Sequence, residues 1–480
     1  MVNVLTKPNK NPLWQTSRPE RISYYVYFCG QNMIYTLVTS YLIAALVFQG
    51  LDITKAATIT LFIKIWDAVN DAIFGCIFDK VRFKSGEKFI PWLKISLFAI
   101  PITTVLLFAM PKNTGEMFKL VWYAVTYMLW DTAYTLCDAP IYGFVTAMTE
   151  RIDERTALQS YKSIMGGVGT GLATIIATVL ISEKVGSNYF VISIVVSVVA
   201  LLTMMPVCKT GKERCAGEND QAFTLKAMFK YLVSNKYLLL YYLGIFFQSS
   251  ANIVSALNLW VSYYLFHNTL FSMVVMVISA VPSLIFSLLV PKLVEKFDKM
   301  KIYLICNILT VLLSLIMWLC GYNSMIVFII ISVLRAIPQS ITGVMYYMFT
   351  PDCAEYGRFK TGTDAKGITF AIQTFMVKLT AAISSALSLY LLGVIGLKDV
   401  SQAENFQQLE LLNISQSAST LNGLWFIYVI VPAIGVAVAT LIWSFYKLND
   451  HDVELMTKAN SGTITREEAL SQLKNKNIVE

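Results

Sequence analysis

The stretch WDAVNDAIFGCIFDK, residues 66–80, lies for most of its length in an apolar segment, 56–78, that is long enough to cross a bilayer. It nevertheless carries two acids and an amide, Asp67, Asn70 and Asp71. Burying a carboxylate in lipid costs at least ~2.5–3.5 kcal/mol on the insertion scale. A segment that keeps two of them therefore indicates a membrane helix that holds a polar site.

The composition of the chain predicts a multispanning membrane protein. Of 480 residues, 56% are hydrophobic and 14% are charged, whereas soluble domains have about 25% charged residues. We therefore interpret the formal net charge of +8 through membrane topology and expect no nucleic-acid partner. Residues 1–21 are polar and basic, which predicts no cleavable signal peptide. Eight scattered cysteines and only two histidines predict packed free thiols, without a zinc or histidine-based catalytic site.

The hydropathy pattern predicts an all-α membrane protein with twelve transmembrane helices. Each apolar segment is near the ~20 residues that a spanning helix needs. The predicted spans are 22–49, 56–78, 90–110, 118–147, 156–182, 188–208, 236–266, 269–290, 301–320, 324–350, 364–396 and 422–447.

The connections between these spans alternate in charge. One side of the membrane receives 24 lysines and arginines and the other side only 5, so the positive-inside rule places both termini in the cytoplasm. The spans divide into an N-terminal bundle (1–208), a cytoplasmic middle loop (209–235) and a C-terminal bundle (236–450). This is the pattern of major facilitator transporters, whose substrate site lies near the midplane between halves. The tail, 451–480, is expected to be a solvated cytoplasmic end with one short helix at 464–474.

The second span has the chemistry of a cation site. Asp67 and Asp71 are four residues apart and stack on one helix face about 6 Å apart, with Asn70 on the same side. Carboxylate and amide oxygens are hard ligands that suit a small hard cation. The fourth span, WDTAYTLCDAPIY (130–142), adds Thr135 and Asp138 on a shared face, just before a helix-kinking proline.

The eleventh span supplies an opposite charge. In GITFAIQTFMVKLTAA (367–382), Lys378 stands within an apolar helix, with Gln373 and Thr374 four to five residues before it. A lysine there needs an anionic partner, and Asp71 and Asp138 are the candidates. The alternative is that these charges only brace the helices. Arg335 is less specific, because it could lie near the outer surface and extend its side chain into the interface.

Four stretches in the same order give the chain a family resemblance. WDAVNDAIFGCIFDK, TLCDAPIY, PDCAEYGRFKTGT and IQTFMVKL together make it resemble the glycoside–pentoside–hexuronide:cation symporters, over residues from about 20 to 450. The resemblance implies a sodium site at Asp67, Asn70, Asp71 and Thr135. It implies substrate contacts at Asp138, at Tyr142 as a stacking aromatic, at Gln373, Thr374 and Lys378, and at Lys162, where arginine is usual in the family.

One departure from the family bears on the substrate. The first helix of the melibiose-transporting members has an acid that grips galactosyl hydroxyls, whereas FCGQNMIY (28–35) has Asn32 at that place. Losing this negative charge disfavours melibiose-like galactosides and removes repulsion against an anionic sugar. Asn32 could also donate a hydrogen bond to a neutral sugar, so pentosides and hexuronides both stay open.

Charged residues at the cytosolic helix ends are predicted to form gates. In the family, such charges pair across the halves when the inner side closes; the alternative is that they only set topology. The predicted gating residues are Asp79, Arg82, Arg151, Arg155, Asp352, Glu355 and Arg358, with Lys80 and Lys360 beside them.

The sequence therefore predicts cation-coupled sugar symport by alternating access. Sodium is the expected coupling cation, with lithium or protons as alternatives, and no cofactor is expected. We expect a monomer in the cell membrane whose partners are a sugar or glycoside, a monovalent cation and the lipid bilayer. Two further classes stay open. A prenyltransferase-type membrane enzyme would need acid clusters at two cytosolic helix ends, whereas the acids here lie mid-helix. A sensor with a transporter fold would bind sugar without moving it.

Overall fold

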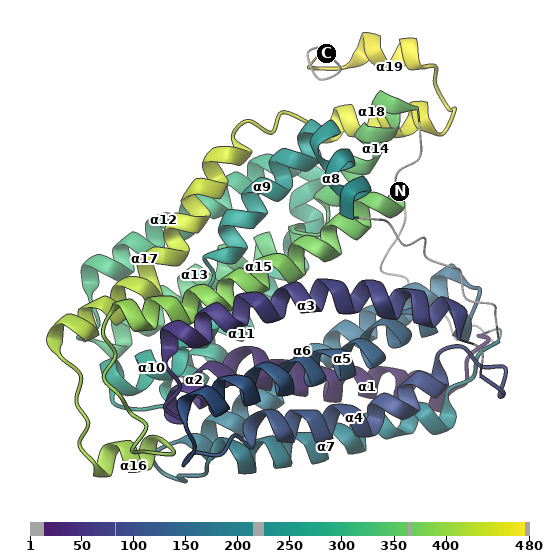
Figure 1. Cartoon of the computed structure of the whole chain (residues 1–480). Coiled ribbons are helices and arrows are strands. Elements are labelled where there is room, and N and C mark those ends of the chain that lie inside the picture. The colour runs from purple at the N-terminus through teal and green to yellow at the C-terminus, as the bar shows by residue number, and fades with distance from the viewer. Residues whose placement is uncertain (1–13, 82, 215–224, 363–365, 476–480) are drawn as a thin grey trace. The chain divides into compact units, whose positions relative to one another are not determined.

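The computed structural model describes residues 14–81, 83–214, 225–362 and 366–475, apart from the side chains of certain helical residues, chiefly between 64 and 80. Throughout these ranges the regular secondary structure is helical (Figure 1). The chain divides into two compact units. Unit 1 comprises the described residues of Met1–Ala45, Ile65–Ile181 and Val185–Asn219, and unit 2 comprises those of Leu46–Lys64, Ser182–Lys184 and Asp220–Glu480.

The first half of the chain forms long helices joined by short turns. Its first helix runs from α1 through a five-residue π-helical turn, η1, into α2 without a break, and the helix α3 then begins in unit 2 and continues into unit 1. The bounds are α1 Arg18–Thr36, η1 Leu37–Tyr41, α2 Leu42–Phe48, α3 Ile53–Lys80, α4 Ile90–Phe108, α5 Glu116–Met148, α6 Ile152–Ile181 and α7 Tyr189–Thr210.

Glycines let α1 lie unusually close to two neighbouring helices. A Cβ atom on Gly30 would lie 2.3 Å from Thr203 Oγ1 of α7, and one on Gly169 of α6 would lie 2.2 Å from the Cys29 carbonyl oxygen. Small residues at such crossings allow backbones to approach closely in membranes, where the helices are held by van der Waals packing. The position of α1 is thus fixed from two sides, and with it the residues that directly follow Gly30.

The second half begins with α8 and carries the tail. The bounds are α8 Leu225–Ser234, α9 Lys236–Ser250, α10 Val254–Phe266, α11 Phe271–Lys296, α12 Lys299–Cys320, α13 Met325–Met345, α14 Phe349–Thr361, α15 Lys366–Val394, α16 Phe406–Leu411, α17 Ala418–Trp443, α18 Asp450–Asn460 and α19 Arg466–Gln472.

The predicted span 236–266 is interrupted in the structure, because α9 ends at Ser250 and α10 begins at Val254. Such a break frees backbone carbonyls, which must be satisfied inside a membrane protein. Here the Ser384 hydroxyl of α15 donates to the Asn252 carbonyl oxygen at 2.8 Å. The side chain of a neighbouring helix thus replaces one of the lost backbone hydrogen bonds.

Two segments predicted as connections contain helices. The predicted spans 324–350 and 364–396 leave the residues between them as a connection, but α14 occupies most of that stretch. Pro351 and Asp352 are both in the first turn of α14, where a missing backbone N–H is tolerated. Gly362, in the left-handed conformation, ends the helix. The middle loop likewise contains α8, and the tail contains α18 in addition to α19. The prediction that the tail is only a solvated end is wrong, since α18 packs on α14.

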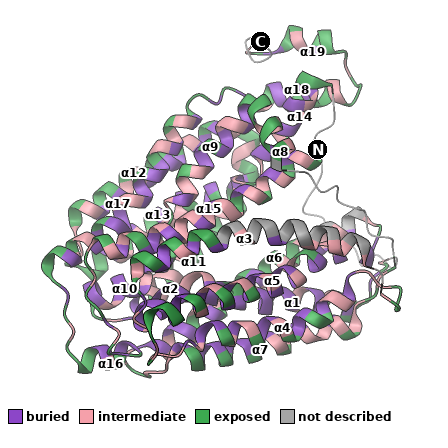
Figure 2. Ribbon diagram, viewed as in Figure 1, coloured by how far each residue is buried: buried purple, intermediate pink, exposed green. Residues whose placement is uncertain are grey.

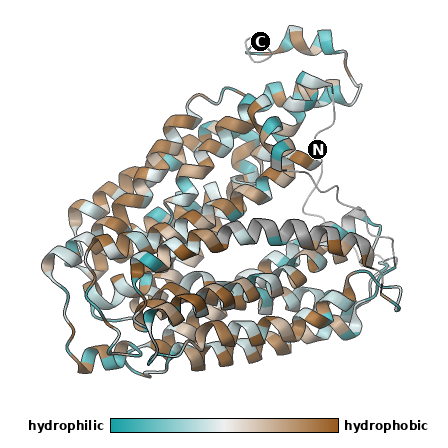
Figure 3. Cartoon of the chain, in the orientation of Figure 1, coloured by the Kyte–Doolittle hydropathy of each residue, from teal (hydrophilic) through white to brown (hydrophobic). Residues whose placement is uncertain are grey.

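Many helical residues are exposed (Figure 2), and most of the helices are rich in hydrophobic residues (Figure 3). Leu288 and Leu319, for example, are 79% and 82% exposed. Apolar surface of this extent is typical of a membrane-embedded protein. Within the described residues, ten helical segments are long and apolar enough to span a membrane. The helices α3 and α5 have 28 and 33 residues, and the count of twelve spans stays a prediction.

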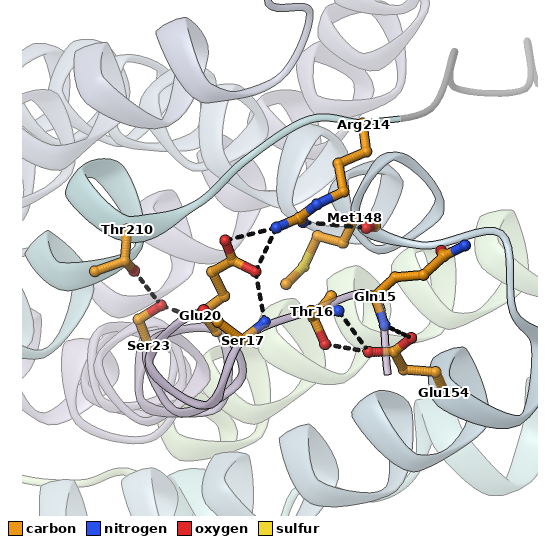
Figure 4. Close-up of polar contacts among 9 residues, drawn as sticks. All are labelled: Gln15, Thr16, Ser17, Glu20, Ser23, Met148, Glu154, Thr210 and Arg214. Carbon is orange, nitrogen blue, oxygen red and sulfur yellow. Dashed lines mark hydrogen bonds and ion pairs between the residues drawn. The ribbon is translucent and has the colours of Figure 1, made fainter. Parts of the chain in front are cut away.

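A segment before α1 is tied to the α5–α6 turn by one buried carboxylate (Figure 4). Glu154 accepts hydrogen bonds from the backbone N–H groups of Gln15 and Thr16, at 3.2 and 3.0 Å, and from the Thr149 hydroxyl at 2.8 Å. The Thr16 hydroxyl donates to it as well. Burial raises the pKa of the Glu154 carboxyl, but these four hydrogen bonds outweigh burial and hold that pKa below its usual value.

An ion pair fixes the start of α1. The Arg214 guanidinium donates to both oxygens of the buried Glu20 carboxylate, at 2.8 and 2.9 Å. Ser23 and Thr210 share a hydrogen bond of 2.6 Å one turn further on (Figure 4). Together these contacts attach the ends of α1, α5, α6 and α7 to one another.

We expect Glu154→Gln to lower the free energy of unfolding by about 2–3 kcal/mol, because an amide cannot replace a carboxylate that accepts several hydrogen bonds. A carboxyl with a depressed pKa stabilises the fold above its unfolded pKa, and that stability is lost as pH falls through the folded pKa. Thermal melting of the purified protein at neutral and acidic pH measures both effects. Glu150→Gln, at an exposed side chain nearby, is the control. Equal melting temperatures of the two variants would contradict the stabilising role of the Glu154 carboxylate.

Candidate functional site

Three polar side chains form a hydrogen-bonded cluster between α3 and α5 in unit 1. The Asn70 amide donates to Thr135 Oγ1 at 3.0 Å, and the Thr132 hydroxyl donates to Asn70 Oδ1 at 3.2 Å. Asn70 is 1% exposed and Thr135 7%. The side chains of Asp67 and Asp71, predicted for the same cation site, lie outside the described residues.

This cluster offers the kind of oxygen that alkali cations bind. An amide oxygen and two hydroxyl oxygens are hard, uncharged ligands, and the hydrogen bonds of Asn70 hold them close together between α3 and α5. Thr132 was missed by the sequence reasoning. Its spacing of three residues from Thr135 on one helix was the available signal, because residues at that spacing share a helix face.

Asp138 is held by a residue that the sequence reasoning did not select. The Gln31 amide of α1 donates to Asp138 Oδ1 at 2.7 Å, and the same amide lies 3.8 Å from Cys137 Sγ. Gln31 is 2% exposed, and its own Oε1 is buried without a hydrogen-bond partner among the described residues. A buried acceptor of this kind costs free energy until a donor reaches it, so the pair can accept hydrogen bonds from a polyhydroxyl ligand.

Lys162 lies over aromatic rings beside this pair. Its Nζ is 3.8 Å from the centre of the Tyr142 ring and 5.0 Å from that of Phe28. Cation–π contacts at these distances favour a positive charge over the ring face. One face of Tyr142 is thus in contact with Lys162, and the phenol remains 48% exposed.

Asn32 faces α6 in this structure. Its amide donates to the Phe28 carbonyl oxygen of its own helix at 2.9 Å, and a Cβ on Gly166 would lie 3.0 Å from its Nδ2. Its predicted substrate role stays a prediction. One turn further along α1, Tyr35 lies beside Tyr134 of α5, with ring centres 5.6 Å apart.

In unit 2, the predicted residues lie on α15. Lys378 is partly buried and Thr374 is exposed, with its hydroxyl donating to the Phe370 carbonyl oxygen at 3.3 Å. The Oε1 atom of Gln373 is buried and accepts no hydrogen bond from the described residues. Arg335 does not extend to the surface as expected. It is 8% exposed, with Nη1 3.8 Å from Met317 Sδ.

The predicted gating residues that the structure describes are partly engaged within their own units. Arg155 donates to the carbonyl oxygens of Thr149 and Thr146, at 2.7 and 3.1 Å, and so caps the end of α5. Asp352 forms an ion pair with Lys299. The remaining members are Glu355, which accepts from Asn460 at 2.8 Å, the partly buried Arg151 and Arg358, and Asp79 and Arg82, whose side chains lie outside the described residues.

Residues 23–450 match the family model described as MFS/sugar transport protein. The chain is 28% identical over 443 residues to the uncharacterized symporter YjmB of Bacillus subtilis (strain 168), covering 90% of this chain and 93% of that one. It is 24% identical to the isoprimeverose transporter of Lactiplantibacillus pentosus (91% and 90% covered) and to the glucuronide carrier protein homolog of Escherichia coli (strain K12) (89% and 92%). These likenesses confirm the resemblance drawn from the four motifs.

Solved transporter structures share the fold at low identity. A bacterial homologue of the human lysosomal transporter Spinster, inward-facing and occupied, matches with a TM-score of 0.65 at 12% identity, covering 91% of this chain and 99% of that one. A D-xylose-proton symporter matches with a TM-score of 0.58 at 14% identity, covering 89% and 98%. The two-bundle helical fold predicted from the sequence is thereby confirmed.

We expect Gln31→Leu to weaken sugar binding about tenfold, because Asp138 loses its donor and Gln31 Oε1 is no longer present as an acceptor. Direct titration of the purified protein with sugar measures the affinity. Thr39→Val is the matched control on the same helix, since the Thr39 hydroxyl donates only to its own helix, at the Tyr35 carbonyl oxygen. Unchanged affinity in Gln31→Leu would exclude Gln31 from the site.

Proposed function

Because the chain belongs to the MFS/sugar transport protein family, we propose that it moves a sugar or glycoside across the membrane by alternating access, coupled to a monovalent cation. The observation that carries the proposal is the placement of two polar clusters on one helix. Thr135, in the cation cluster, and Asp138, in the sugar cluster, are three residues apart on α5.

This spacing supports a physical route for coupling. Three residues of α-helix rise about 4.5 Å, so a cation that orders Thr135 also restrains Asp138. Symport requires that each ligand raise the affinity for the other by the same factor. In our proposal the cation binds first, at Asp67, Asn70, Asp71 and Thr135, and the sugar then binds at Asp138, with Lys162 and Tyr142 beside it.

Sodium is the proposed coupling cation. Two acids, an amide and a threonine hydroxyl form a set of hard oxygens of the kind that binds it. A proton-coupled carrier of the same fold is the second candidate, since Asp67 and Asp71 could also carry a proton. We place the protein in the cell membrane with both termini in the cytoplasm, on the basis of the charge asymmetry of its connections.

The substrate proposed is a glycoside, pentoside or hexuronide. Asp138 would accept strong hydrogen bonds from ring hydroxyls, and Lys162 and Lys378 could each meet the carboxylate of a uronic acid. The isoprimeverose and glucuronide names of two relatives are consistent with this range. Uptake of a panel of such sugars into vesicles, with and without a sodium gradient, tests the function; a chain that moves none of them would support a sensor or an enzyme.

We expect Asp71→Cys to abolish gradient-driven uptake while sugar binding partly survives, because the proposed sugar contacts lie at other residues. Uptake into vesicles with an imposed sodium gradient, and titration of sugar without sodium, separate the two effects. Sodium stimulation that is normal in Asp71→Cys would show that the cation binds elsewhere.

Lys378→Ala should abolish transport while the protein still inserts into the membrane. A lysine within a spanning helix requires an anionic partner, and removing the Lys378 ammonium leaves that partner without its counter-charge. Uptake per inserted carrier is the measurement. Lys292→Ala, at an exposed lysine of α11, is the control. A wild-type rate in Lys378→Ala would exclude Lys378 from the transport mechanism.

A further inference from the structure

The C-terminal tail is packed into unit 2 beside α14 (Figure 1). Met456 and Ala469 of the tail are fully buried, and Leu473 is 4% exposed, in a core that also contains Tyr356 and Phe359 of α14. Asp452 is fully buried as well; its carboxylate accepts from the Lys474 backbone N–H and the Asn449 amide. These buried contacts hold the tail against α14 in this structure.

The polar contacts of the tail reach the acids of α14. The Asn460 amide, at the end of α18, donates to the Glu355 carboxylate at 2.8 Å and to its carbonyl oxygen at 2.9 Å. Asp450, at the start of α18, pairs with Lys299 at 3.2 Å, and Lys299 also pairs with Asp352. One tail helix thus restrains both acids of α14 that the sequence predicts as gating residues.

A third contact extends this restraint along α14. The Arg466 guanidinium of α19 lies 5.3 Å from the centre of the Phe359 ring. Asp352, Glu355 and Phe359 are spaced by three and four residues, so they share one face of the helix. The tail therefore covers a single face of α14.

We propose that Asn460 and Asp450 are positioning residues for transport: they hold Glu355 directly and Asp352 through Lys299, so that α14 and the tail move as one body. The inference rests on the proposed transport function and gives the helix α18, which begins where the predicted C-terminal bundle ends, a part in it. In this scheme the tail sets the orientation of the α14 acids in every turnover. Removing one of its contacts slows turnover and leaves sugar affinity unchanged, since neither Asn460 nor Asp450 is among the residues proposed to contact the sugar.

The test combines single and double variants. Asn460→Ala and Glu355→Ala should each lower turnover per folded carrier roughly fivefold to tenfold, the effect of losing one hydrogen bond to a charged acceptor. The double variant should be no slower than Glu355→Ala alone, because Asn460 acts through Glu355. Asn460→Lys, which keeps a donor near Glu355, should retain most of the turnover. Sugar affinity, measured by titration, should equal that of the wild type in all four.

The matched control is on the same helix. Glu454 and Lys458 form an exposed ion pair within α18, 65% and 47% exposed. Within the part of the chain that the structure describes, neither side chain pairs with Asp352 or Glu355 of α14. Lys458→Ala should therefore transport at the wild-type rate. This control variant separates loss of the hydrogen bond between Asn460 and Glu355 from a general effect of substitutions in α18.

A second readout does not depend on transport. Cys353 of α14 is fully buried, with Sγ 3.5 Å from the Tyr446 hydroxyl, so its alkylation reports displacement of α14. Peptide-resolved labelling should show faster alkylation of Cys353 in Asn460→Ala than in the wild type or in Lys458→Ala.

The outcomes separate the inference from the proposed function. A wild type that transports no sugar, with Cys353 exposed only in Asn460→Ala, would overturn the transport function and keep the coupling of tail and α14. A wild-type turnover in Asn460→Ala, additive losses in the double variant, or a Cys353 labelling rate that does not change would each overturn the inference. A fall in sugar affinity parallel to a fall in folded protein would reduce Asn460 to a structural role.

Discussion

The close packing of α1 between α6 and α7 is the constraint from which the polar face of unit 1 follows. Backbone contact at Gly30 and Gly169 leaves no room for a side chain at either position, so α1 cannot shift or rotate without separating from both neighbours. Gln31 is the next residue after Gly30, and its direction is therefore set by backbone packing. The hydrogen bond from Gln31 to Asp138 is thus a consequence of helix packing as much as of polar chemistry.

The helix α5 brings the polar clusters of unit 1 onto one rigid element. Its residues Thr132 and Thr135 contact Asn70 of α3, and Asp138 contacts Gln31 of α1. In the bilayer core, polar side chains of this kind are costly unless their hydrogen bonds are satisfied. Each cluster satisfies part of this demand with hydrogen bonds from an uncharged amide side chain, Asn70 in one and Gln31 in the other.

Hydropathy predicted where the long helices lie, because spanning segments need a continuous apolar run that few other structures require. It did not predict α14, whose sequence is polar and has a proline, Pro351, in its first turn. It did not predict the docking of the tail either, because an amphipathic pattern shows that a helix has an apolar face but not which helix that face packs against. In the site, Asn70, Thr135 and Asp138 were selected because polar residues stand out in apolar helices. Gln31 was not predicted, because the resemblance to the family points to the neighbouring Asn32 as the residue in the position of the acid. Only the structure shows that the Asn32 side chain packs against Gly166 of α6.

The π-helical turn η1 interrupts the α-helical hydrogen bonding between α1 and α2 with one wider turn. Such a turn holds an additional residue relative to an α-helix, and each residue of an α-helix turns the chain by about 100°. The face that α2 presents therefore depends on the chain length between Thr36 and Leu42 as well as on its sequence. Tyr41, whose hydroxyl lies 2.7 Å from Thr178 Oγ1, fixes the helix directly after this turn. The first helix thus consists of two segments in different angular register, so that a residue gained or lost here in evolution would rotate α2 without disturbing Gln31.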